Sequence, residues 1–203
     1  MRPTTVFFDL ETGGLEKDHP IIQLAAVAVR DWKELAFFER KIKFDAAKCD
    51  PKALTLNGFD PEAWTAEARP EAEVMRSFNG FLEEFSDLTL LSKKSGRPYT
   101  IARLAGHNIQ EFDVPHLRRA MDRAGVSFMK GCWWYPLDSY QRALWYFAER
   151  PTEPAPVDYK VQTLAKHFGI PPQGAEHEAL ADVRLSALVA MALTTGEVAP
   201  RLG

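Results

Sequence analysis

The chain has 203 residues, enough for one well-buried domain with insertions but hardly for two full domains. Hydrophobic residues make up 46% and charged residues 26%, as is ordinary for a globular protein, and the most apolar stretches are too short to span a bilayer. The net charge of −3 argues against a protein that simply coats nucleic acid. It does not exclude an enzyme that acts on nucleic acid, because clustered catalytic acids lower the total while basic groups elsewhere hold phosphates.

The compartment is predicted from the first residues and the cysteines. Residues 1–5 lead directly into a predicted strand, with no secretory signal. Cys49 and Cys132 suggest no disulfide framework. We therefore expect a cytoplasmic protein with reduced thiols and no membrane partner.

The first predicted strand, residues 6–12, carries two acids and is followed by a glycine turn. Because successive strand side chains point to opposite faces, Asp9 and Glu11 project from the same face. Adjacent carboxylates repel each other and resist desolvation unless a positive group lies between them, and a hard divalent cation is the simplest such group. An exposed strand end with solvated acids is the alternative, and the Asp-x-Glu pattern alone does not distinguish the two.

The remaining elements predict one α/β domain that spans residues 1–203. Short connections between alternating strands favour an antiparallel meander at the start, and strands then alternate with helices. The predicted strands are 6–12, 21–30, 34–44, 101–106 and 132–137. The predicted helices are 51–57, a short one from 61, then 70–88, 113–124, 139–149, 159–168 and 178–194, and residues 92–98 form a basic loop. This order indicates a mixed five-stranded sheet with helices packed on it.

A second polar group lies where strand 101–106 ends and helix 113–124 begins. Loops at the carboxyl ends of strands are where open α/β sheets build binding sites. Asp113 could instead cap the helix, and Asn108 could simply bond the loop backbone. Phe112 is expected to fill the core beneath the turn.

A third group opens the last predicted helix. Asp182 lies inside that helix among apolar residues, where a carboxylate needs a partner such as a metal ion. His177 precedes Asp182 by five residues and could overhang the same site. Taken alone, His177 is a surface loop histidine, and the neighbouring acids Glu176 and Glu178 are solvated or interact with the helix dipole.

Together, the three groups resemble the motifs of the DEDDh 3′–5′ exonucleases, a family that includes the proofreading exonuclease subunit of bacterial DNA polymerase III, RNase T and oligoribonuclease. The resemblance rests on three blocks, which in this chain are Asp9-Leu10-Glu11-Thr12, Asn108 with Phe112-Asp113, and His177 with Ala179 and Asp182. A sister class has tyrosine four residues before the last aspartate. Because this chain has Glu178 there, the histidine class fits.

The resemblance implies an RNase H-like fold and two Mg²⁺ or Mn²⁺ ions held by Asp9, Glu11, Asp113 and Asp182. His177 is then the general base that takes a proton from the attacking water. The implied reaction is hydrolysis of the terminal phosphodiester in the 3′→5′ direction, with release of nucleoside 5′-monophosphates.

The resemblance also implies contacts with the 3′ end of a single-stranded nucleic acid. The implied contact residues are Thr12, Gly13, Leu15, Asn108 and Phe112. Many relatives have Glu-Thr-Thr-Gly where this chain has Glu11-Thr12-Gly13-Gly14. Gly13 therefore removes a side chain from the turn that faces the substrate in the family.

DNA is the favoured polymer, but an exoribonuclease or oligoribonuclease of the same family would carry the same motifs, and the discriminating contact to a 2′-hydroxyl is not identified. A catalytically silent binding module is a further alternative, although it would be expected to have lost one of the catalytic residues. Basic residues that could hold phosphates are Lys41, Lys43, Lys93, Lys94, Arg97, Arg118 and Arg119. A polymerase partner and a homodimer both stay undetermined.

Overall fold

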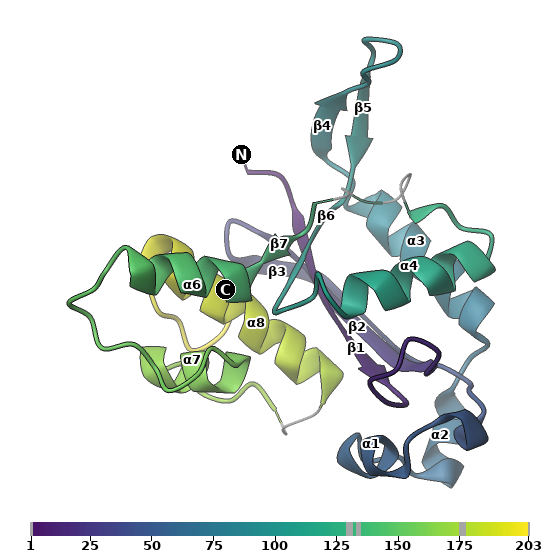
Figure 1. The fold of residues 1–203 in the computed structure, drawn as a ribbon. Helices are drawn as coiled ribbons and strands as arrows, with labels where there is room; N and C mark the ends of the chain where they lie inside the picture. The colour runs from purple at the N-terminus through teal and green to yellow at the C-terminus, as the bar shows by residue number, and fades with distance from the viewer. Residues whose placement is uncertain (1, 129–131, 133–134, 175–177, 203) are drawn as a thin grey trace.

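The computed structural model of the chain describes residues 2–128, 132, 135–174 and 178–202. Its main feature is a five-stranded sheet with the strand order β3-β2-β1-β6-β7 (Figure 1). The sheet confirms the predicted mixed architecture, because its first three strands are antiparallel and its last two run parallel to β1.

The antiparallel half is the predicted meander. It consists of β1 (Thr5–Thr12), β2 (Ile21–Arg30) and β3 (Lys33–Lys41). Asp31 and Trp32 join β2 to β3 with φ angles of 50° and 63°. This left-handed pair is what a tight hairpin connection needs to match the twist of the strands.

The parallel half differs from the prediction in its boundaries. Strand β6 (Arg103–Gly106) pairs with β1, and β7 (Leu137–Asp138) pairs with β6. The fifth strand was predicted over 132–137, but Cys132 forms only an isolated bridge with Ala102. Residues 133 and 134 lie outside the described part of the chain.

A hairpin between the two halves was not predicted. Helix α3 ends at Glu84 rather than at residue 88, and β4 (Leu88–Leu91) and β5 (Pro98–Ile101) form a separate two-stranded sheet. The predicted basic loop is the tip of this hairpin. Strands of four residues give too few alternations to be recognised beside a helix and a loop.

Helices cover both faces of the main sheet (Figure 1). Helices α3 (Glu71–Glu84) and α4 (Asp113–Arg123) pack on the face that buries Phe8, and α8 (Ala179–Thr195) packs on the face that buries Phe7. Helices α6 (Ser139–Ala148) and α7 (Val161–Phe168) pack on the outer side of α8. The short elements η1 (Ala46–Lys48), α1 (Pro51–Leu56) and α2 (Pro61–Glu67) lie beyond the carboxyl end of β1.

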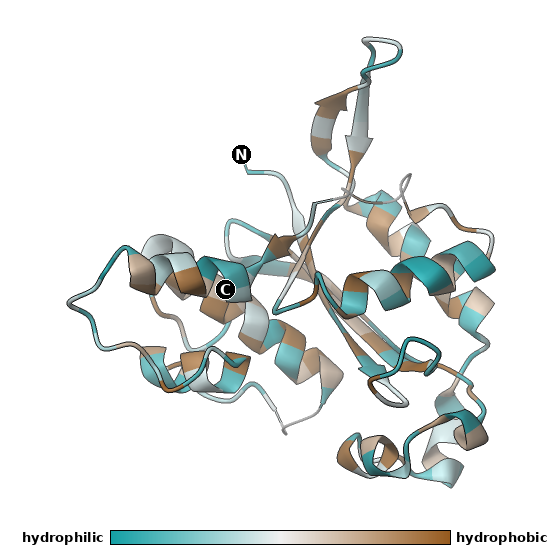
Figure 2. Ribbon diagram, viewed as in Figure 1, coloured by the Kyte–Doolittle hydropathy of each residue, from teal (hydrophilic) through white to brown (hydrophobic). Residues whose placement is uncertain are grey.

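Helix α8 is buried on most of its circumference because it lies between the sheet and the α6–α7 pair. Figure 2 shows the contrast with α4, which is mostly polar on the side seen in that view. Among the described residues, no helix has both the length and the apolar character needed to cross a membrane.

Candidate active site

The acids of β1 lie beyond the point where the pairing of β1 with β6 ends. Strand β1 pairs with β6 only from Thr5 to Phe7, whereas its pairing with β2 continues to the end of the strand. Asp9 and Glu11 lie beyond the last residue paired with β6 and on the same face as Phe7. The site therefore opens at the carboxyl ends of the parallel strands, where open α/β sheets place their ligands.

Asp113 is the first residue of α4, and its carboxylate points back to β1. The Leu10 N–H donates to Asp113 Oδ1 at 3.2 Å. Leu10 lies beyond the last residue of β1 that pairs with β6. The alternative that Asp113 caps its own helix is wrong, because the N-cap position belongs to Phe112 and has no side-chain hydrogen bond. Asp113 is thus a buried carboxylate that joins α4 to the central strand.

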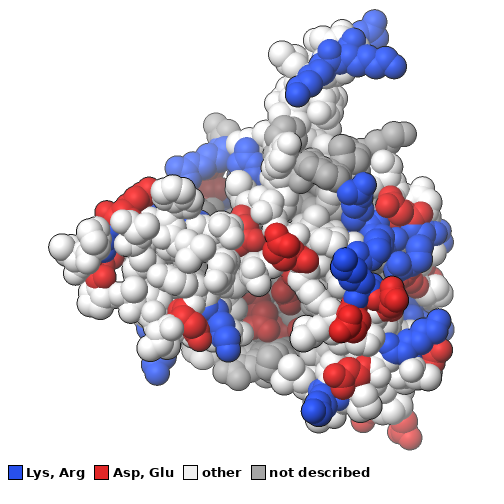
Figure 3. All heavy atoms as spheres, in the orientation of Figure 1, with Lys and Arg blue, Asp and Glu red and all other residues white. Residues whose placement is uncertain are grey.

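Asp182 reaches the site from the first turn of α8, which packs against β1 and β2. Its neighbours Ala181 and Val183 are buried, while Asp182 is half-buried. Gln162 on α7 donates to Asp182 Oδ1 at 3.4 Å. The three separate sequence groups thus meet through β1, α4 and α8, and Figure 3 shows acidic side chains in the middle of this face, with basic ones around α4.

The pKa values of Asp9, Glu11 and Asp113 are all raised. Burial raises the pKa of Asp9 well above its ordinary value, and the charges of Asp113, Glu11 and Asp182 raise it further. Burial, followed by the charge of Asp182, raises the pKa of Glu11 to about 7. Burial also raises the pKa of Asp113 to about 7, although the hydrogen bond from Leu10 opposes this shift. The site is therefore short of positive charge.

The residues of the site fit divalent cations, because all four candidate ligands are carboxylates and the charges of the other three raise the pKa of Asp9. Within the described ranges, however, no three His, Cys, Asp or Glu side chains are already gathered closely enough to hold an ion.

The turn after β1 explains Gly13. A Cβ at this position would lie 2.4 Å from Cys49 Sγ, so a side chain does not fit without movement of the 45–50 segment. Gly13 also donates to the Pro20 carbonyl at 2.8 Å and accepts from the Asp50 N–H at 2.7 Å. The departure from the family pattern is thus accounted for by close packing inside this turn.

The other predicted contact residues differ in their exposure and in whether their polar groups already have hydrogen-bond partners. Thr12 is buried and its Oγ1 donates to the Gly14 carbonyl, so its hydroxyl already has a partner within the turn. Leu15 is 85% exposed at the same turn. Asn108 is exposed with a φ of 58°, and the ring of Phe112 lies against that of His116 with 4.5 Å between centroids. Phe112 is therefore only half-buried, rather than a core residue.

His177, the predicted general base, lies outside the described residues. His107 precedes the Asn108 loop, but both of its ring nitrogens already have hydrogen-bond partners within the protein. Its Nδ1 and Nε2 each lie 2.8 Å from a partner, Ser139 Oγ and the Tyr159 carbonyl, and burial lowers the pKa of His107.

Asp138 is a residue that the sequence interpretation missed. It caps α6 through the Tyr140 N–H and also accepts hydrogen bonds from the N–H groups of Asn108 and Gln110. It thus holds the loop between β6 and α4 that carries the second acidic group. The Asp-Ser pair before helix 139–149 is a capping signal, but the bonds to the distant loop are not visible in the sequence.

Comparisons with a family model and with solved structures show what the chain is similar to. Residues 99–190 match the family model RNase_T, which is described as Exonuclease. No curated protein matches the sequence. Solved structures with a similar fold include exonuclease I from Methylocaldum szegediense, with a TM-score of 0.73 and 18% identity over 97% of this chain and 42% of that chain.

Two further similar structures are of E. coli exonuclease I. The complex with a dT13 oligonucleotide has a TM-score of 0.70 and 20% identity, over 95% of this chain and 40% of that chain. The zinc ion bound form of the complex with single-stranded DNA has a TM-score of 0.68 and 20% identity, over 95% and 40%. The likeness establishes an RNase H-like fold. This chain spans less than half the length of each of these proteins.

Proposed function

We propose that the chain is a member of the DEDDh 3′–5′ exonuclease family. It would be a metal-dependent enzyme that removes nucleotides from the 3′ ends of single-stranded nucleic acid, with DNA as the favoured polymer. The observation that carries this proposal is the set of four carboxylates from β1, α4 and α8 at the carboxyl end of the central strand, where neighbouring charges raise the pKa of Asp9 and Glu11. A structural role alone does not explain why burial and neighbouring acids together raise the pKa of Asp9, Glu11 and Asp113. In this proposal, residues 1–203 form one exonuclease domain.

Two Mg²⁺ or Mn²⁺ ions would be held by these residues. Asp9, Glu11 and Asp182 would hold one ion, and Asp9 and Asp113 would hold the second, because Mg²⁺ is bound by carboxylate oxygens. When bound, the ions lower the pKa of the attacking water and stabilise charge on the phosphate and the leaving oxygen. Asp113 would keep its hydrogen bond with Leu10, which fixes α4 against β1.

The chain's own residues would supply orientation and proton transfer. His177 would accept a proton from the water as its oxygen bonds to phosphorus, because an imidazole titrates near neutral pH. The bond from phosphorus to the 3′ oxygen of the shortened strand would break, and the product would be a nucleoside 5′-monophosphate. Asp138 would position the Asn108 loop through the two backbone hydrogen bonds it accepts there.

Substrate contacts would lie on both sides of the acids. The backbone around Thr12 and Gly13 would meet the terminal 3′-hydroxyl, because the Thr12 hydroxyl is already bonded within its turn. Leu15, with 85% of its surface exposed, would pack on the last base. Asn108 and Phe112 would border the site on the α4 side. Such contacts are tolerant of base sequence.

The test uses 5′-labelled single-stranded DNA and RNA of one sequence, incubated with Mg²⁺, with Mn²⁺ or with EDTA and resolved on a gel. We expect a ladder that shortens from the 3′ end, requires the metal and forms faster on DNA. The Asp9→Asn variant should give no ladder. Faster shortening of RNA would replace DNA with RNA in the proposal, and no cleavage of either polymer by folded protein would leave a silent binding module.

A further inference from the structure

The β4–β5 hairpin projects from the body of the molecule, and within the described part of the chain its two strands pair only with each other (Figure 1). Its register is regular, from Leu88 opposite Ile101 to Leu91 opposite Pro98. The tip is closed by hydrogen bonds from the Ser92 N–H to the Arg97 carbonyl and from the Gly96 N–H to the Ser92 carbonyl, at 3.0 and 2.8 Å. The hairpin therefore presents a defined turn to solvent.

The tip concentrates positive charge. Residues 88–103 contain four basic residues and no acidic one, although the whole chain has a net charge of −3. Lys93, Lys94 and Arg97 are exposed, and none of the three forms an ion pair with another described residue. Figure 3 shows this cluster standing apart from the acids of the body.

Two of the other basic candidates, Lys41 and Arg119, already have partners within the protein. Lys41 Nζ lies 2.8 Å from Glu67 and over the ring of Trp64. Arg119 donates to the Lys17 carbonyl at 3.2 Å. Repulsion among the hairpin cations has no such compensation, and a chain of phosphates would provide it.

An aromatic ring accompanies the cations. Tyr99 is 44% exposed and directly precedes the strand residues that lead back to the body. It shares a face of the hairpin with Leu90, which is opposite it in the register. Cations beside an exposed aromatic ring are the combination that binds single-stranded nucleic acid, because phosphates meet the charges while bases stack on the ring.

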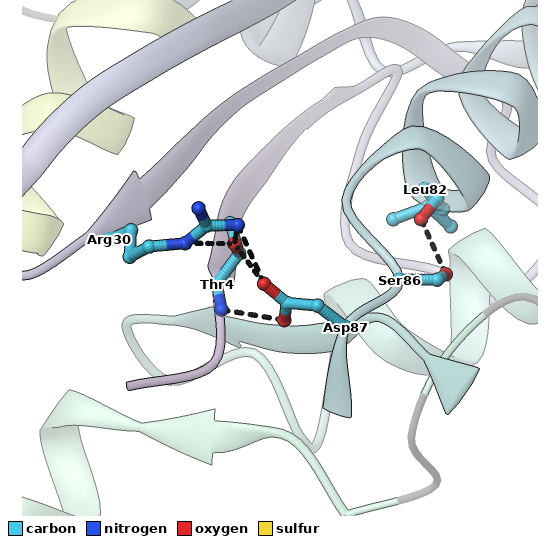
Figure 4. Close-up of polar contacts among 5 residues, drawn as sticks. All are labelled: Thr4, Arg30, Leu82, Ser86 and Asp87. Atoms are coloured by element: carbon cyan, nitrogen blue, oxygen red, sulfur yellow. Dashed lines mark hydrogen bonds and ion pairs between the residues drawn. The ribbon is translucent and has the colours of Figure 1, made fainter. Parts of the chain in front are cut away.

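The base of the hairpin is fixed to the amino end of β1 (Figure 4). Asp87, directly before β4, accepts hydrogen bonds from the N–H and the Oγ1 of Thr4, both at 2.7 Å. Arg30 at the end of β2 forms an ion pair with Asp87 at 2.7 Å and also donates to Thr4 Oγ1. The hairpin therefore leaves the sheet from a defined point.

We infer that the β4–β5 hairpin is a second contact for the substrate strand, in which Lys93, Lys94 and Arg97 hold phosphates upstream of the 3′ end and Tyr99 stacks on a base. This inference rests on the proposed function, since it concerns the same nucleic acid. Five strand steps from Asp9 to Thr4 and six from Asp87 to Lys93 cover about 36 Å at roughly 3.3 Å per residue, and the contact between Thr4 and Asp87 adds to this path. At about 3.4 Å per stacked nucleotide, a strand of somewhat more than about ten nucleotides spans this distance.

The experiment compares the wild type with a triple variant, Lys93→Gln, Lys94→Gln and Arg97→Gln. Binding of a 5′-fluorescein-labelled 30-nucleotide single-stranded DNA is followed by anisotropy in EDTA over a series of salt concentrations. Because each lost phosphate contact on a single strand lowers the slope of log K against log salt by about 0.7, we expect a slope smaller by about 2. Hydrolysis of a 4-nucleotide DNA with Mg²⁺ should stay unchanged, since so short a strand does not reach the hairpin.

The matched control neutralises three exposed cations on other elements, Lys33→Gln, Lys166→Gln and Arg201→Gln. Equal salt slopes for the two triple variants would overturn the inference, as would equal losses on the 4- and 30-nucleotide substrates. In addition, Tyr99→Ser should weaken binding of the 30-nucleotide DNA by about tenfold, while Tyr99→Phe should keep it. Far-UV circular dichroism verifies that each variant is folded.

The two proposals fail in different ways. If the wild type hydrolyses both substrates and the hairpin variant binds like the control, the hairpin has no part in binding and the exonuclease proposal stands. If the hairpin variant loses binding but the wild type hydrolyses nothing, the hairpin is a nucleic-acid contact and the catalytic proposal is wrong.

Discussion

The carboxylates at the two ends of β1 have pKa values that are shifted in opposite directions. At the amino end, burial tends to raise the pKa of Asp87, but the hydrogen bonds from Thr4 and Arg30 and the charge of Arg30 outweigh it and hold the pKa below its ordinary value. At the carboxyl end, Asp9 lies among other acids, and its pKa is raised.

The difference separates structural from functional carboxylates in this fold. A carboxylate that stabilises the protein brings its own donors and counter-charge, as Asp87 does. Asp9 is instead buried among other acids whose charges raise its pKa, which is typical of a carboxylate that binds a ligand. The following predictions test the two ends of β1, by single substitutions and by a change of pH.

The largest effect is expected from Asp9→Asn. The change removes the carboxylate that would be shared by both ions, so we expect turnover to fall by about a thousandfold or more. Because it also removes a buried charge that others repel, the melting temperature in EDTA should not fall. Gel assays and thermal melts measure the two effects. Retained activity would contradict the two-ion assignment.

His177→Ala should slow hydrolysis by about 10²–10⁴-fold if His177 is the general base. The carboxylates are unchanged in this variant, so titration with Mn²⁺ should give the same affinity as in the wild type. The acid limb of the pH–rate profile should also change its shape. A rate and profile equal to those of the wild type would reject the role.

The two ends predict opposite responses of stability to pH. In the metal-free protein, the pKa values of Glu11 and Asp113 rise from ordinary values of 4.5 and 3.8 to about 7. Between the ordinary and the raised pKa values, the folded state binds protons more tightly than the unfolded chain. The contribution of protonated Glu11 and Asp113 to stability is therefore lost as the pH rises from about 4 to about 7. Because the pKa of Asp87 is lowered, its contribution is lost instead as the pH falls below 3.8.

Melting temperatures in EDTA from pH 3 to pH 8 measure both responses. We expect a decline from about pH 4.5 to about 7.5, and addition of Mg²⁺ at pH 7.5 should reverse it because cations replace the protons. Asp9→Asn should flatten the decline. A level profile across this window would mean that the carboxylates do not interact as their positions indicate.

Asp87→Asn alters the amino end alone. The amide replaces an acceptor by a donor that faces Thr4 and Arg30, so we expect the free energy of unfolding to fall by about 1–3 kcal/mol. Hydrolysis of a 4-nucleotide substrate should keep the wild-type rate, because the site is at the other end of the strand. Urea denaturation measures the loss, and Glu84→Gln on the exposed end of α3 is the control.

The smallest effect is expected from Gly13→Ala, at the turn that follows β1. Its Cβ would meet Cys49 Sγ at 2.4 Å, so we expect a loss of about 1–2 kcal/mol. Adding Cys49→Ala removes the sulfur and should recover part of the loss in a double-mutant cycle. Equal stability of Gly13→Ala and the wild type would show that the turn adjusts freely.

The sequence by itself determined the parts of this protein that depend on local patterns. Alternation placed β2 at residues 21–30, a capping aspartate and proline placed α2, and helical spacing placed Phe78 and Leu82 in the core. The candidate site acids were also recognisable, because Asp9, Asp113 and Asp182 each lie in a short block that resembles a family motif. These features were predictable since each rests on residues a few positions apart.

Only the tertiary structure decided how those parts act on one another. Asp113 could have been a helix cap until its hydrogen bond with Leu10, 103 residues away, assigned it to the central strand. The raised pKa values, the bonds of Asp138 to the Asn108 loop and the anchoring of the hairpin by Thr4 and Arg30 likewise join distant segments. Electrostatic and hydrogen-bond energies depend on distances in space, and the packing of the sheet and its helices sets those distances.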